Sequence, residues 1–125
     1  MSGPKRILIA DDEEMVRSLV RRMLGKTYRV LEADNGEEAV KVAVNQKPDL
    51  ILMDILMPKM DGLTACYAIK RNQATKAIPI IMLTAVDYDL NRKLSQDVMG
   101  AEGYITKPFE SQALMKMIAK FTSPN

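Results

Sequence analysis

Residues 50–54 read Leu-Ile-Leu-Met-Asp, a run of four apolar side chains that ends at an acid. A strand with one face in water alternates apolar and polar residues, whereas a strand buried on both faces is apolar throughout. Residues 7–10 (Ile-Leu-Ile-Ala) and 80–83 (Ile-Ile-Met-Leu) have the same character. The sequence therefore predicts a parallel sheet that is covered on both faces by helices.

Apolar runs alternate with stretches of helical periodicity along the chain. The predicted strands are residues 6–10, 28–33, 49–53, 78–83 and 103–106. Apolar residues follow the helical spacing at positions 16, 19, 20, 23 and 24, and again at positions 114, 117, 118 and 121. Further helices are predicted after Asn35 and after Asp61, which are good N-cap residues, and over residues 89–99. This alternation predicts an α/β fold with a doubly wound parallel sheet.

Length and composition fit one globular domain. The chain has 125 residues, and we predict a single domain with its core at about residues 5–121, followed by a tail or the start of a linker at 122–125. The apolar runs are far shorter than the roughly 20 residues that span a bilayer, so we expect no membrane segment. The single cysteine, Cys66, cannot form an internal disulfide. A reducing, cytoplasmic location is the expectation.

Charge and aromatic content give no indication of nucleic-acid binding. The net charge is only +2, and the basic residues are scattered. Aromatic residues make up 5% of the chain, and tryptophan is absent. A base-stacking platform needs exposed aromatic side chains, so we expect no direct contact with nucleic acid.

Polar side chains stand where the predicted strands end. Asp11 and Asp12 follow the first strand, Asp54 the third, Thr84 the fourth and Lys107 the fifth. Taken singly, each has an ordinary explanation, such as a helix cap, a turn, a strand terminus or a solvated loop. The carboxyl ends of parallel strands share one edge of the sheet, and this edge is where doubly wound folds bind ligands. Their convergence therefore predicts a functional site.

The chemistry of this set is coherent. Three carboxylates at one place repel one another, and a divalent cation relieves that repulsion. Oxygen ligands suit Mg²⁺, whereas zinc is disfavoured because the chain has no histidine and one cysteine. A carboxylate such as Asp54 can attack phosphorus and form an aspartyl phosphate. Phosphoryl transfer then needs positioning and charge neutralisation, which Lys107 and the Thr84 hydroxyl can supply.

These residues match the motifs of a known family. They resemble response regulator receiver domains, including the stand-alone chemotaxis regulators, from about residue 5 to residue 121. The resemblance rests on Asp11-Asp12, residues 54–62 (Asp-Ile-Leu-Met-Pro-Lys-Met-Asp-Gly), Leu83-Thr84-Ala85 and Lys107-Pro108-Phe109. It implies a flavodoxin-like sheet of order 2-1-3-4-5 with five helices.

The resemblance also implies roles for individual residues. Asp54 would be the phosphoacceptor. Asp12 would bind Mg²⁺ directly, with Asp11 alongside or acting through water, and the backbone carbonyl of Leu56 would complete the protein ligands. Thr84 would bond a phosphoryl oxygen.

The remaining family positions concern charge, switching and the rim of the site. Lys107 would contact the phosphoryl group by charge, and its peptide bond to Pro108 would be cis. Tyr104 would be a switch residue that moves as Thr84 shifts. Val86 and Pro108 would lie at the rim.

The function implied is signalling in a phosphorelay. A sensor histidine kinase or a phosphotransfer protein would donate the phosphoryl group. The domain would be no conventional enzyme, although it would catalyse its own phosphorylation and a slow autodephosphorylation. Output would pass through the face formed by the fourth helix, fifth strand and fifth helix to an effector or a fused output domain. By the same resemblance, Leu56 and Val86 would flank the path of the hydrolytic water, and their apolar side chains predict a long-lived phosphoryl group.

Other functions of the same architecture fit less well. An FMN-binding flavodoxin would need a phosphate loop after the first strand, where this chain has Asp-Asp-Glu-Glu. A phosphatase with an aspartate nucleophile would want a second acid at position 56, which is Leu56. An interaction module that is never phosphorylated stays open from the sequence. Labelling with a small phosphodonor and Mg²⁺ discriminates between that module and a receiver.

Overall fold

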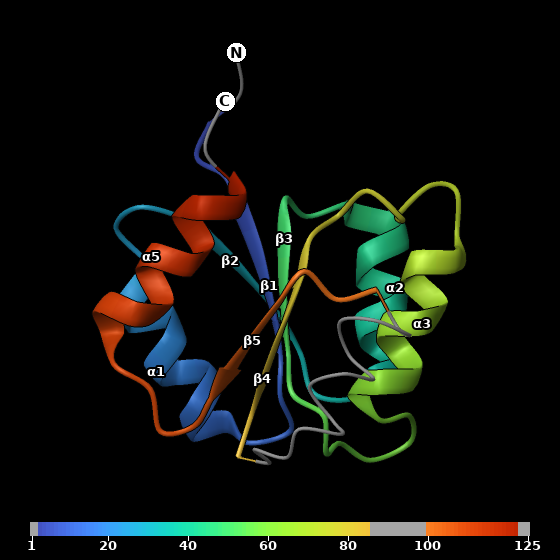
Figure 1. Ribbon diagram of the computed structural model, residues 1–125, viewed down its shortest axis with the longest axis horizontal. Coiled ribbons are helices and arrows are strands. Elements are labelled where there is room, and N and C mark those ends of the chain that lie inside the picture. Colours follow the sequence, from blue (N-terminus) through green and yellow to red (C-terminus); the bar gives the residue numbers. More distant parts are fainter. Residues whose placement is uncertain (1–2, 86–99, 123–125) are drawn as a thin grey trace.

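The five predicted strands form one parallel sheet. The structure is a computed structural model that describes residues 3–85 and 100–122 (Figure 1). The strand order is β2-β1-β3-β4-β5, as the resemblance implied. The strands are β1 (Arg6–Ala10), β2 (Arg29–Ala33), β3 (Leu50–Met53), β4 (Ile80–Thr84) and β5 (Gly103–Thr106).

Strand boundaries differ from the prediction by one or two residues. β4 begins at Ile80 and not at residue 78, because the N–H of Ile78 donates to Thr75 in a turn and Pro79 has no N–H. The fourth strand also includes Thr84, which was expected to follow it. The sequence pattern locates the apolar run, whereas the turn that precedes it decides where pairing starts.

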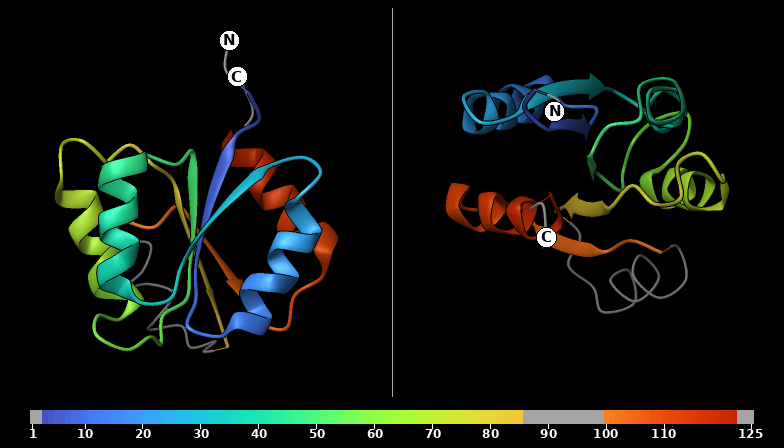
Figure 2. Two further views of the ribbon diagram at one scale, coloured as in Figure 1. Left: turned by 180° about the vertical axis from the view of Figure 1, so that it is seen from behind. Right: turned by 90° about the horizontal axis from the view of Figure 1, so that it is seen from above.

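Helices cover both faces of the sheet. The pair α1 (Glu14–Leu24) and α5 (Ser111–Thr122) lies on one face, and the pair α2 (Gly36–Gln46) and α3 (Gly62–Arg71) lies on the other (Figure 1, Figure 2). The predicted N-caps are confirmed: the side chain of Asn35 accepts from the N–H of Glu38, and that of Asp61 accepts from the N–H of Thr64. The helix predicted over residues 89–99 lies outside the described residues.

The apolar run of residues 50–53 is buried on both sides. Leu50 and Leu52 pack on the α1 and α5 side, and Ile51 and Met53 pack on the α2 and α3 side. All four side chains have 0% exposure. Successive residues of a strand point to opposite faces, so a strand between two helical layers needs an apolar residue at every position.

The topological switch point of the sheet lies between β1 and β3. These strands are neighbours, with Ala10 opposite Met53, but the helices that follow them lie on opposite faces of the sheet. The residues after this pair are Asp11 and Asp54. The N–H of Asp54 donates to the carbonyl of Ala10 at 2.9 Å, so the ladder continues into the two aspartates. The topology therefore brings two carboxylates together at the switch point, as doubly wound folds do with their ligand sites.

Gly62 allows α3 to start directly against the backbone of Asp54. Its N–H donates to the carbonyl of Ile55 at 2.8 Å. A Cβ at this position would lie 1.9 Å from the carbonyl oxygen of Asp54. That oxygen belongs to the backbone, so no rotamer change can remove the overlap.

We expect Gly62→Ala to destabilise the fold and displace Asp54. Overpacking against a backbone atom costs roughly 1–3 kcal/mol, and the smaller entropy of the unfolded alanine chain offsets only about 0.4–1 kcal/mol of this. Urea unfolding monitored by circular dichroism measures the change. Gly3→Ala is the matched control, because nothing lies within 4 Å of a Cβ at that position. Equal stability of the two variants would contradict the close approach.

Candidate functional site

Three carboxylates gather at the switch point. Oxygen atoms from Asp11, Asp12 and Asp54 all lie within 4.8 Å of one another. Asp11 has 0% exposure and Asp54 has 5%, whereas Asp12 is exposed. The adjoining pocket is lined by Asp12, Glu13, Asp54, Leu56, Ala85 and Lys107. The structure thus brings together the acids that the sequence predicted, in a pocket that solvent can reach.

Lys107 enters this cluster from the end of β5. Its Nζ lies 2.8 Å from Oδ2 of Asp11, 3.4 Å from Oδ2 of Asp54 and 3.8 Å from Oε1 of Glu13. Burial alone would lower the pKa of Lys107, but the hydrogen bond to Asp11 and the charges of Asp54 and Asp11 outweigh it and raise the pKa. Lys107 is therefore a permanent cation that balances part of the acidic charge.

The fold disfavours the ionised form of the Asp54 carboxylate. Burial raises the pKa of Asp54 most, and the charge of Asp11 raises it further. The charge and hydrogen bond of Lys107 and the N–H of Ile55 act in the opposite direction without cancelling the rise. The net direction agrees with the expected repulsion among the acids, and an added cation would relieve it.

Asp11 serves both the helix and the site. Its Oδ1 accepts from the N–H of Glu13 at 2.9 Å, and its Oδ2 accepts from Lys107. Glu13 occupies the N-cap position of α1, and its side chain makes no cap hydrogen bond. The capping explanation for the aspartate pair is thus half right, since one oxygen of Asp11 satisfies a backbone donor while the other faces the charge cluster.

Of the other predicted residues, Thr84 and Pro108 belong to the same edge of the sheet. Thr84 ends β4 opposite Thr106 of β5. The side chain of Thr84 lies outside what the structure describes. Pro108 is exposed, and its peptide bond with Lys107 is cis, as the resemblance implied. Tyr104 is 9% exposed and belongs to the core on the α2 and α3 side. Val86 lies outside the described residues.

Leu56 lies in the loop that leads from β3 to α3. Its side chain is 64% exposed at the edge of the pocket. Further along the same loop, Lys59 has a φ of 68°, in the left-handed region.

Two residues near the acidic cluster were not predicted from the sequence. Glu13 approaches Lys107, and Nη1 of Arg17 donates to the backbone carbonyl of Asp11 at 2.7 Å. The signal for Arg17 was its helical spacing from Val20, which placed a charged side chain beside the apolar stripe.

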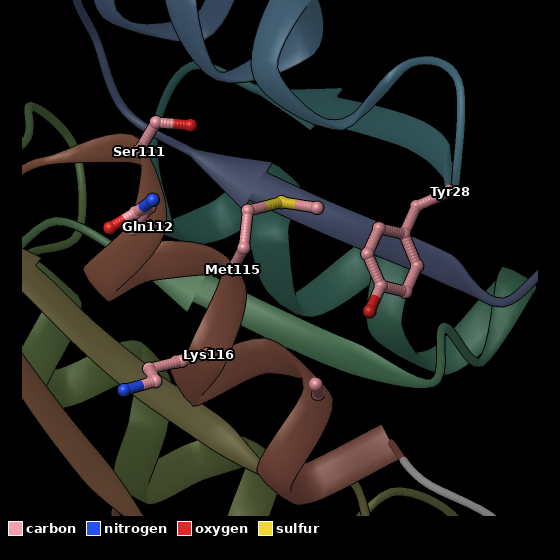
Figure 3. Close-up of a pocket in the computed structure, with 6 residues that line it drawn as sticks. Tyr28, Ser111, Gln112, Met115 and Lys116 are labelled. Atoms are coloured by element: carbon pink, nitrogen blue, oxygen red, sulfur yellow. The ribbon is translucent and has the colours of Figure 1, made fainter.

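A second hollow lies away from the acids, between Tyr28 and α5. Figure 3 shows the Met115 side chain extending toward the Tyr28 ring, with Ser111, Gln112 and Lys116 around it. This lining contains no carboxylate. The hollow has neither a nucleophilic acid nor oxygen ligands for a hard cation, so the acidic pocket remains the candidate site.

The sequence profile of the response regulator receiver domain matches residues 7–119. The chain belongs to this family. The receiver domain is 40% identical over 120 residues to the alkaline phosphatase synthesis transcriptional regulatory protein PhoP of Bacillus subtilis, covering 93% of this chain and 49% of that protein. It is also 40% identical over 116 residues to the chemotaxis protein CheY of Halobacterium salinarum, covering 92% of this chain and 94% of that protein.

A solved structure supports the same assignment. The receiver domain of a sensor histidine kinase from Pseudomonas aeruginosa, which has a magnesium ion coordinated in its active-site cleft, superposes with a TM-score of 0.88 at 30% identity. The match covers 96% of this chain and 98% of that one. The present receiver thus spans about half the length of PhoP but nearly all of CheY. Across its described residues, no helix is both long enough and apolar enough to cross a membrane.

We expect Asp54→Asn to stabilise the metal-free receiver. The raised pKa of Asp54 means that its ionised form costs stability at pH 7, and Asn removes the charge while keeping the shape. The melting temperature should rise by roughly 3–5 °C, which is about 1 kcal/mol for a chain of this length. The gain should shrink as the pH falls toward about 4, where the unfolded-state carboxyl also takes up its proton.

Differential scanning calorimetry in EDTA measures this difference. Glu110→Gln is the control, because it removes one negative charge from an exposed residue outside the acidic cluster. A lower melting temperature for Asp54→Asn than for this control would show that the pair with Lys107 outweighs burial and repulsion.

Proposed function

We propose that this chain is a single receiver domain that accepts a phosphoryl group on Asp54 from a phosphohistidine of a sensor histidine kinase or a phosphotransfer protein. The observation that carries the proposal is the meeting of three carboxylates within 4.8 Å, beside the Nζ of Lys107. In the transfer, the P–N bond of the donor breaks and a P–O bond to Asp54 forms. The neutral imidazole leaves with its proton supplied by solvent.

Four residues of the site have assigned parts in this reaction. The Asp54 carboxylate is the nucleophile, and β3 holds it at the pocket through the hydrogen bond of its N–H to Ala10. Lys107 contacts the phosphoryl oxygens and balances their charge, since it already lies 3.4 Å from Asp54. Thr84 donates its hydroxyl to a phosphoryl oxygen, and Tyr104 follows the movement of Thr84.

The acidic cluster fits a magnesium ion. Asp11, Asp12, Asp54 and the backbone carbonyl of Leu56 would hold it, and all of these are the hard oxygen ligands that Mg²⁺ prefers. When bound, Mg²⁺ neutralises charge on the phosphoryl oxygens during transfer. Lys107 contacts Asp11 and Asp54, so these two acids would serve the lysine and the cation together.

Exposed apolar side chains next to the pocket support a protein as the phosphodonor. The side chain of Leu19 is 42% exposed, and that of Leu56 is 64% exposed. Val16, Leu19, Pro108 and Phe109 line a hollow that shares Ala85 and Lys107 with the acidic pocket. Apolar groups grouped around a charged pocket are typical of a protein contact.

The domain is a signalling phosphoacceptor that catalyses its own phosphorylation and a slow autodephosphorylation. Its output face comprises β5, α5 and the helix expected over residues 89–99, and it contacts an effector protein or a fused output domain. We place the protein in the cytoplasm and expect no direct contact with nucleic acid. An interaction module without phosphorylation would keep the fold but would have no need of an Asp54 that is costly to ionise.

Intact-mass measurement tests the phosphosite. Incubation with acetyl phosphate and Mg²⁺ should add one phosphoryl group, and Asp54→Asn should abolish the addition because an amide is no nucleophile here. Asp61→Asn is the control: it changes the exposed N-cap aspartate that precedes α3 and should label like the wild type. Labelling of the Asp54→Asn variant would move the acceptor elsewhere, and an unlabelled wild type would favour the interaction module.

The exposed Leu56 side chain gives a prediction about the lifetime of the phosphoryl group. Its apolar group at the pocket cannot hydrogen-bond the water that attacks phosphorus, whereas Leu56→Asn could orient that water. One such hydrogen bond is worth about 1 kcal/mol, or roughly five-fold in the rate of phosphate loss. Phosphate release after removal of the donor measures it, with Leu56→Met as the apolar control. Equal rates for the two variants would mean that Leu56 only packs on the rim.

A further inference from the structure

Arg17 links the acidic loop to the neighbouring strand. Its side chain is 16% exposed, and its Nε pairs with Oε1 of Glu32 on β2 at 2.9 Å. Its Nη1 donates to the backbone carbonyl of Asp11 at 2.7 Å. Arg21 also pairs with Glu32, but its side chain is 46% exposed. The described hydrogen bonds of Arg21 do not include the Asp11 carbonyl, so of these two arginines Arg17 is the one that connects Glu32 to the site.

The contact fixes the backbone from which Asp12 emerges. The peptide that joins Asp11 to Asp12 is planar, so anchoring its carbonyl also sets the direction of the Asp12 N–H and Cα. On the other side of Asp11, its N–H donates to the carbonyl of Ala33 at 3.1 Å. Both peptide groups that flank Asp11 are therefore tied to β2, one of them through Arg17.

Asp12 needs this support more than its neighbours do. Asp11 is held through its side chain by Glu13 and Lys107, and Asp54 is also in contact with Lys107. Within the described part of the chain, the Asp12 carboxylate accepts no hydrogen bond, and the residue is exposed. Its position relative to the other two acids therefore depends on the backbone.

We propose that Arg17 is a positioning residue for divalent-cation binding, acting through the Asp11 carbonyl to place the Asp12 carboxylate. This inference rests on the proposed function, since it concerns the same metal site. A positioning role for Arg17 is distinguishable from a simple effect of its charge, because the two change the cation affinity in opposite directions. A guanidinium near the site repels a cation, so its removal would tighten binding by charge alone, whereas loss of positioning weakens binding.

The test is the Mg²⁺ affinity of the unphosphorylated protein, measured by NMR titration. For Arg17→Met, we expect the dissociation constant to rise by roughly ten-fold, in the range typical of residues that orient metal ligands. Arg21→Met is the matched control: it removes the same charge and a contact to the same Glu32, but leaves the Asp11 carbonyl bonded. Its dissociation constant should stay within about two-fold of the wild type.

A second variant guards against a loss of folding. Arg17→Lys keeps the charge but has a single ammonium in place of the guanidinium fork, so its affinity should fall between those of the wild type and Arg17→Met. The NMR spectrum of each variant before the titration shows whether it is folded. Equal or tighter Mg²⁺ binding by Arg17→Met than by Arg21→Met would overturn the inference. A wild type that binds no Mg²⁺ would overturn it together with the metal site of the proposed function.

Discussion

The acidic site depends on the contact of one ammonium, that of Lys107, with two carboxylates. Lys107 lies 2.8 Å from Asp11 and 3.4 Å from Asp54, and thus joins the ends of β5, β1 and β3 across the edge of the sheet. Two nearly buried acids side by side would otherwise repel in a medium that screens poorly. The parallel sheet brings them together, and the lysine makes their proximity tolerable. The remaining cost appears as the raised pKa of Asp54, which leaves the pocket receptive to a further cation.

The two walls of the pocket are built differently. The loop from Asp54 to Gly62 is fixed by backbone contacts: the N–H of Gly36 donates to the carbonyl of Met60, and Gly62 packs on the carbonyl of Asp54. Neither contact depends on a side-chain rotamer or on ionisation. Lys107, in contrast, is held at the site by charge. On the proposed function, a change of charge at Asp54 would therefore act first on Lys107 and β5, while the loop that follows Asp54 would keep its place.

The sequence sufficed for features that depend on local pattern. Unbroken apolar runs predicted the buried parallel strands, and the acids and lysine at the strand ends predicted the site, because parallel topology alone brings those ends together. The N-caps Asn35 and Asp61 were also readable, since capping involves only neighbouring residues. Contacts set by the packing of whole elements were not readable: the approach of Gly62 to Asp54 depends on where α3 docks, and the bond from Arg17 to Asp11 depends on how α1 lies over β2. The start of β4 was missed because Ile78 is engaged by the preceding turn.

Charge balance also connects the site to the proposed output face. Phosphorylation of a side chain adds about −1.5 to −2 charge. On the proposed function, that charge appears at Asp54, and the new oxygens compete with Asp11 for the ammonium of Lys107, which now bonds Asp11 at 2.8 Å. Lys107 directly follows β5, where Tyr104 is packed in the core on the α2 and α3 side. On that proposal, a shift of Lys107 toward phosphorus would pull on the strand that carries Tyr104, and through the loop at Pro108 on the start of α5. The cation that makes the acidic cluster tolerable would then also be the element through which its charge state reaches the surface.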